Sequence, residues 1–194
     1  MKHLGLIALL VIGAAAAAAT AGGREASTPS AARCGGTLWR LKTFSDSRRM
    51  SVHLPPAATT VADVGKRPFP RPLPRERRTP FQRQAWEVVA QITQYRLESG
   101  GVRLVLFDAG SYLNAVLPVP DCLSARTRAR DQILGAWRRF MVECGRPTVE
   151  WQSLGAIAYV RGLGFWGGRG ATPGSARNGA QLYPVTNIRI VAGC

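Results

Sequence analysis

The stretch WEVVAQITQYRLESGGVRLVLFDAGSYLNAVLP, residues 86–118, decides the fold of this chain. Its first part, residues 86–97, alternates apolar with polar side chains and is rich in residues that favour strands. A hairpin turn at residues 98–101 leads to a second predicted strand at residues 102–107, and a further turn leads to a third at residues 112–117. We therefore predict a meander of three strands.

The next predicted element is a helix from Ala125 to Glu143. Apolar side chains recur on it at helical spacing and form one stripe: Ile133, Leu134, Trp137, Phe140 and Met141. Ser124 is the predicted N-terminal cap, and Gly145 is predicted to end the helix.

Two further strands are predicted at residues 155–160 and 182–191, separated by a glycine-rich loop at residues 162–179. The loop begins with a G-x-G-x-x-G match, which in dinucleotide-binding units opens a helix. Its glycines continue and prevent a helix, so we interpret it as a connecting loop. Phe165 and Trp166 in it fit a core position and an exposed stacking platform equally well.

This order of elements predicts a mainly β protein with one helix. Five strands with a helix between the third and fourth are typical of an OB-like five-stranded barrel, in which the helix covers apolar surface that the strands leave open. An open α+β sandwich has the same strands and helix and is the alternative.

The chain begins with a stretch typical of a secretory signal peptide, residues 1–21: a basic start, an apolar run, and Ala19-Thr20-Ala21 as a cleavage site. Residues 22–33 are small and polar, and we expect them to be disordered. No later apolar run is long enough to span a membrane. We therefore predict a secreted, periplasmic or cell-envelope protein, with an uncleaved anchor as the alternative. Four cysteines in an oxidising compartment favour two disulfides, and three pairings are possible.

An extended N-terminal segment, residues 34–80, is expected to precede the barrel domain at residues 81–194. Within it, residues 55–80 hold seven of the 13 prolines and form a Pro/Arg-rich arm with a polyproline-like path. Leu38, Trp39 and Leu41 form a candidate short strand or anchor.

Few residues in the sequence suit catalysis. Once the leader is removed, His53 is the only imidazole, and it lies beside prolines that hold no general base in a fixed geometry. The carboxylates are scattered singly, without metal-ligand spacing. We therefore predict no catalytic residue, no metal site and no cofactor.

The charge is unbalanced, with 26 Lys and Arg against 11 Asp and Glu and a net charge of +15. Such a surface associates with polyanions, such as nucleic acid, anionic lipid or acidic wall polymers. The candidate contacts are arginines of the predicted helix and the arm: Arg126, Arg128, Arg130, Arg138, Arg139, Arg71, Arg75, Arg77 and Arg78. We predict a non-catalytic domain that binds a polyanion or envelope component. The alternatives are a hydrolase such as a nuclease, and a structural envelope protein that docks through the arm.

The chain resembles a group of uncharacterised exported bacterial proteins whose mature part begins C-G-x-x-x-W-x-x-K-T and ends with a strand containing H-P-V-x-x-I. The matching residues span about residues 34–191: Cys34-Gly35, Trp39 and Lys42-Thr43 at the start, Leu104 to Cys122 in the middle, and Tyr183-Pro184-Val185 with Ile188 at the end.

This resemblance implies a Cys34–Cys122 disulfide, which leaves Cys144–Cys194 as an additional pair. It also implies acidic and histidine positions on three strands, which Arg103, Val116 and Tyr183 occupy in this chain. Any chemistry performed by those positions in the group should therefore be missing here.

Overall fold

The computed structural model describes residues 34–168, 170 and 172–194. The predicted signal peptide at residues 1–21 and the segment at residues 22–33 lie outside the described residues.

The predicted three-strand meander is confirmed. It consists of β2 (Gln84–Glu98), β3 (Gly101–Asp108) and β4 (Ser111–Pro118), paired antiparallel. Leu104 of β3 pairs with Tyr95 of β2 and with Ala115 of β4, and all three side chains are buried. The apolar half of the alternation therefore faces the core, as the period of two requires.

The predicted helix is α3 (Arg130–Cys144), which begins five residues later than the sequence suggested. Ser124 is not its cap, because the helix starts after Ala129, which has a left-handed conformation and no capping side chain. Ile133 and Phe140 of the apolar stripe are buried, and Trp137 packs against the same core. Gly145 ends the helix with a positive φ, as predicted.

The last two strands are longer than predicted: β5 (Gln152–Trp166) and β6 (Ala180–Ala192). Residues 162–166, assigned to the loop from their glycines, belong to β5. The glycines fit a strand here because a side chain at Gly164 would collide with the backbone carbonyl of Phe81. Phe165 and Trp166 are both at most 3% exposed, so both are core residues and neither is an exposed stacking platform.

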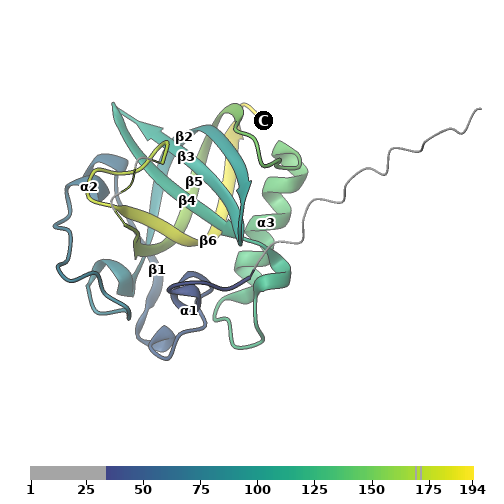
Figure 1. Cartoon of the computed structure of the whole chain (residues 1–194). Coiled ribbons are helices and arrows are strands. Elements are labelled where there is room, and N and C mark those ends of the chain that lie inside the picture. Colours follow the sequence, from purple (N-terminus) through teal and green to yellow (C-terminus); the bar gives the residue numbers. More distant parts are fainter. Residues whose placement is uncertain (1–33, 169, 171) are drawn as a thin grey trace, which may run out of the picture. The chain divides into compact units, whose positions relative to one another are not determined.

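The fold is mainly β, with one six-stranded sheet in the order β1-β2-β3-β4-β6-β5 (Figure 1). The sixth strand, β1 (His53–Ala58), was not predicted, and it pairs parallel with β2. β2 also pairs with β5, so the pairings β2-β3-β4-β6-β5-β2 run in a ring. Two short helices, α1 (Trp39–Lys42) and α2 (Val61–Lys66), accompany α3. The remaining elements are the 3₁₀ turns η1 (Arg49–Ser51), η2 (Phe81–Arg83) and η3 (Pro120–Cys122).

Residues 34–80 share the core of the strands. Val61 and Val64 of α2 are fully buried in the main core cluster. The Pro/Arg-rich arm lies along the body, where Phe69 packs edge-on against Trp166 at 6.0 Å between ring centroids and Pro74 is buried.

Both disulfides implied by the resemblance are present. Cys34 is bonded to Cys122 with the Cα atoms 5.3 Å apart, and Cys144 is bonded to Cys194 with the Cα atoms 4.9 Å apart. The first ties the start of the described chain to η3. The second ties the end of α3 to the last residue of the chain.

Candidate polyanion-binding site

The short helix α1 is held against the body by residues of the C-G-x-x-x-W-x-x-K-T motif. The Trp39 ring lies where a side chain at Gly100 would be, so this close approach requires glycine in the β2–β3 turn. Thr43 Oγ1 donates to the Trp39 carbonyl at 3.0 Å. Leu41 is 2% exposed and belongs to a small apolar cluster with Phe165. The motif is therefore explained by packing.

Two hollows flank α1, and both are lined by Trp39, Arg40 and Ser47. One, of about 450 Å³, also receives Arg75 from the Pro/Arg-rich arm. The other, of about 320 Å³, receives Arg126 from the segment before α3. We call Arg40, Arg75 and Arg126 the α1 arginines. Three segments far apart in the sequence thus bring guanidinium groups to one short helix.

The α1 arginines are exposed, and none forms an ion pair with a described residue. The two acids that line the larger hollow are already engaged. Asp46 pairs with Arg77, while Glu76 pairs with Arg48 and Arg78. The smaller hollow adds the hydroxyl of Ser124, whereas the Thr43 hydroxyl donates to the Trp39 carbonyl and lies 3.0 Å from Ser45 Oγ. Positive charge beside a hydroxyl donor suits an oxyanion, because charge-assisted hydrogen bonds to phosphate, sulfate or carboxylate are strong.

Arg77 is not an available polyanion contact, which corrects its place among the predicted contacts. Its side chain is 1% exposed and pairs with Asp46, with 2.9 Å between Nε and Oδ2. It also donates to the carbonyls of Leu41 and Gln82. Sequence reasoning counted Arg77 as surface charge because three other arginines of the arm lie close to it in sequence.

Two arginines near α3 are also used internally. Arg128 donates to the carbonyls of Arg49 at 2.6 Å and Val52 at 3.0 Å. Arg139 donates to the Ile188 carbonyl and lies 3.9 Å from Glu143. These bonds attach the segment before α3, and α3 itself, to their neighbours, so both side chains are less free to meet a ligand.

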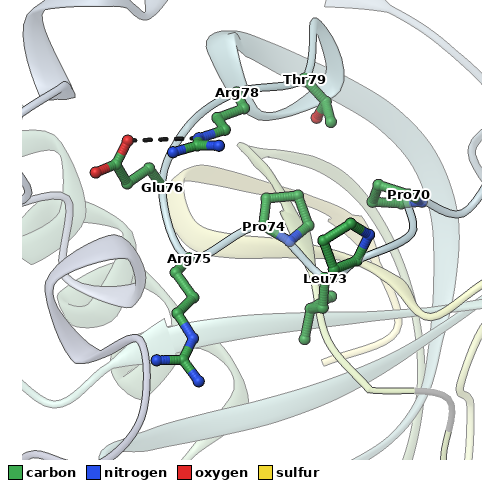
Figure 2. A pocket seen from close by; sticks show the side chains of 8 residues that line it. Pro70, Leu73, Pro74, Arg75, Glu76, Arg78 and Thr79 are labelled. Atoms are coloured by element: carbon green, nitrogen blue, oxygen red, sulfur yellow. Dashed lines mark ion pairs between the residues drawn. The ribbon is translucent and has the colours of Figure 1, made fainter.

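Of the other predicted arginines, Arg71, Arg130 and Arg138 are exposed and form no ion pair in the described part of the chain, and they line neither α1 hollow. Arg78 pairs with Glu76 at 3.5 Å. Figure 2 shows that pair with the side chains of Pro70, Leu73 and Pro74 from the arm. The pair lines a hollow of about 580 Å³ together with these three residues and Arg75. The sequence analysis missed Arg40, whose only signal was its place beside the motif tryptophan.

The positions that the resemblance singled out do lie close together. Arg103 pairs in register with Val116, and Val116 packs with Tyr183. Arg103 shares the Glu98 carboxylate with Arg96, at 2.8 and 2.7 Å respectively. Burial raises the pKa of Tyr183, and burial with the nearby charge of Arg103 lowers the pKa of Lys42. These groups line neither α1 hollow, and the cluster stabilises the fold through ion pairs and packing.

Replacing Glu98 by Gln is expected to cost about 1–3 kcal/mol, because Arg103 and Arg96 would lose their charged acceptor. Burial raises the pKa of Glu98, but the hydrogen bonds and charges of Arg103 and Arg96 outweigh it, so the pKa is lowered. The stabilisation is thus complete above the ordinary pKa and is lost as the pH falls through the lowered value.

Urea unfolding of the parent and the E98Q variant at a series of acidic pH values measures this effect. The difference in the free energy of unfolding between the parent and E98Q should be largest near neutral pH and should become smaller in acid. A difference in the free energy of unfolding that stays constant as the pH falls would contradict the assignment of the stabilisation to the Glu98 carboxylate.

No group of three or more His, Cys, Asp or Glu side chains in residues 34–168, 170 and 172–194 is placed to hold a metal ion. Over the same ranges, every helix is too short or too polar to cross a membrane.

The fold and site together define a mainly β, disulfide-bonded chain with a basic surface around a short helix. No protein-family model matches the chain, and no curated protein matches it either. A similar solved structure is that of a protein assigned as an aspartyl-tRNA synthetase from Leishmania major, with 16% identity and a TM-score of 0.43. The match covers 72% of this chain and 21% of that one. A likeness this weak carries no argument about fold or function.

Proposed function

We propose that this chain is an exported, non-catalytic binding domain that holds polyanions against α1. The observation that carries the proposal is the convergence of the α1 arginines on two adjoining hollows, while the acids beside them are occupied by other arginines. An extended anion that crosses α1 would meet all three guanidinium groups and the Ser124 hydroxyl. The net charge of +15 would attract such a polymer from a distance.

We also propose an OB-like barrel as the architecture of the strands. Support comes from the ring of pairings β2-β3-β4-β6-β5-β2 and from α3, which lies in sequence between β4 and β5. In this description β1 is an additional strand that pairs parallel with the first residues of β2, 84–87.

The export proposal rests on the N-terminal sequence and on the two disulfides, because structural disulfides persist in oxidising compartments. The resemblance to uncharacterised exported bacterial proteins points to the same compartment. An acidic polymer of the cell envelope is therefore the kind of partner that we propose.

The test is the triple variant R40S/R75S/R126S. Each arginine that contacts a phosphate of duplex DNA contributes about 0.9 to the slope of log K against log salt concentration, so the slope should become shallower by about 2–3. The measurement is a salt titration of binding to duplex DNA, with heparin as a second polyanion, starting at low salt.

The matched control is R83S/R138S/R146S, which removes the same charge from exposed arginines that line neither α1 hollow. Its slope should stay close to that of the parent. Equal losses in the two triple variants would show that overall charge, and not the α1 site, causes the binding. A parent that binds neither polymer at low salt would refute the proposal itself.

A further inference from the structure

Tyr112, at the start of β4, is an exposed aromatic residue with an aromatic neighbour. Its side chain is 47% exposed, unlike most large apolar residues of the sheet. Its ring lies against Phe107 of β3, with 4.9 Å between centroids and 46° between ring planes. Tyr112 and Phe107 pair in register across the β3–β4 hairpin, so the two strands fix the position of both rings. One face of the pair is thus available for stacking.

Tyr112 separates two hollows of different character. The first, of about 540 Å³, is basic and contains Lys66 at the end of α2 and Arg177 from the β5–β6 connection. Lys66 lies 3.7 Å from Asp63 and is 77% exposed, and Arg177 is exposed with no ion pair among the described residues. Ser111 adds a hydroxyl to the same hollow, and the Ser175 hydroxyl there is hydrogen-bonded to the Asn114 amide at 3.2 Å.

The second hollow, of about 360 Å³, has no charged residue in its lining. It is lined by residues of four strands and of the β5–β6 connection, and four of them carry hydrogen-bonding side chains: Thr93, Gln94, Tyr112 and Ser153, with Val105, Pro173 and Gly174. The β2–β3 register shifts between Ile92 and Gln94, and such bulges redirect side chains from the regular alternation. The amide and hydroxyl groups therefore line the hollow beside an aromatic ring.

The part of the β5–β6 connection that lines both hollows is fixed by two buried asparagines. Asn178 donates to the carbonyls of Val64 and Arg67, at 2.8 and 2.9 Å, and accepts from the Ala180 amide. Asn114, with its amide oriented to satisfy both ends, donates to the Pro173 carbonyl at 3.1 Å and accepts from the Ser175 amide at 3.3 Å. Both hollows are thus built by tertiary contacts.

We propose that this surface binds single-stranded nucleic acid, with one base stacked on Tyr112. The uncharged hollow would take the base, whose edge needs hydrogen-bond partners such as Gln94 and Ser153, since the Thr93 hydroxyl donates to the Val105 carbonyl. The basic hollow would take the adjoining phosphate through Lys66 and Arg177. Aromatic platforms beside cationic grooves bind single strands in this way. This inference goes beyond the polyanion proposal, because it names a ligand class and uses none of the α1 arginines.

The experiment compares a 15-mer of deoxythymidine with heparin on the parent and on Y112A. Loss of one stacked base should weaken binding of the oligonucleotide roughly 5- to 150-fold. Binding of heparin, which has no bases, should be unchanged. The Y112W variant should restore oligonucleotide binding, since it keeps a flat ring. Thermal melts of each variant check that the fold is retained.

The matched control is Y159A, because Tyr159 lines neither hollow and its ring is covered by Arg189 at 3.8 Å. Oligonucleotide affinity that is equal in Y112A and the parent would overturn the inference. Equal weakening of heparin and oligonucleotide by Y112A would also overturn it, in favour of an acidic glycan on this surface. Because the oligonucleotide is also a polyanion that the α1 arginines would attract, Y112A and Y159A are compared in the R40S/R75S/R126S background, so failure of either proposal is visible separately.

Discussion

The variant Asp46→Ala is expected to lose about 3–5 kcal/mol of the free energy of unfolding, because it leaves a buried guanidinium without its counter-ion. Arg77 is 1% exposed, and Asp46 is its only ion-pair partner among the described residues. Burial lowers the pKa of Arg77, and the Asp46 charge opposes that effect. The Phe44 ring, which is fully buried, lies against the guanidinium with its centroid 4.9 Å from the guanidinium carbon, so Asp46 and this ring are neighbours of the same buried charge.

Chemical denaturation of the parent and the variant measures this loss. The control is Glu76→Ala, because Glu76 pairs with Arg48 and Arg78, whose side chains are 54% and 69% exposed. Exposed pairs of this kind contribute about 0–1 kcal/mol. A double variant, D46L/R77M, should recover part of the loss, since apolar side chains replace the buried pair without leaving a charge. The recovery is incomplete because the Leu41 and Gln82 carbonyls lose the donor that Arg77 supplied. If the free energy of unfolding of D46A is within about 1 kcal/mol of that of the parent, the structural role of Arg77 is contradicted.

Removing the Cys34–Cys122 disulfide is expected to cost about 4–5 kcal/mol, because the bond closes a loop of 88 residues in the unfolded chain. The Cys144–Cys194 disulfide spans 50 residues and should contribute about 4 kcal/mol in the same chain-entropy description. The variants C34A/C122A and C144A/C194A test each bond separately. Guanidinium unfolding gives both values.

The oxidised parent, measured with and without reductant, is the control for the cysteine variants. Reduction should lower the midpoint of the parent by at least as much as the more destabilising of the two variants does. Each double-cysteine variant keeps one disulfide and should therefore lose further stability on reduction. If the parent unfolds at the same guanidinium concentration with and without reductant, the disulfides do not stabilise the protein. That result would also remove the main structural support for export.

The sequence by itself determined the meander and the helix, because each is specified by a local pattern. In residues 86–117 apolar side chains return often enough at every second position to form one buried face of each strand. In α3 the stripe that contains Ile133 and Phe140 forms a single face in the same way. The disulfide pairing came from the resemblance, since four cysteines alone allow three pairings.

Only the tertiary structure decided the pairing of β1 with β2 and the extension of β5 through Gly162 and Gly164. The tertiary structure also decided that Arg77 is the buried counter-ion of Asp46. It likewise brought together the α1 arginines, Arg40, Arg75 and Arg126. Each depends on a partner that is distant in sequence, such as the Phe81 carbonyl that fits against Gly164. Local periodicity says which face of a segment is buried. It cannot say which distant segment covers that face, because that choice depends on the packing and charge of the whole chain.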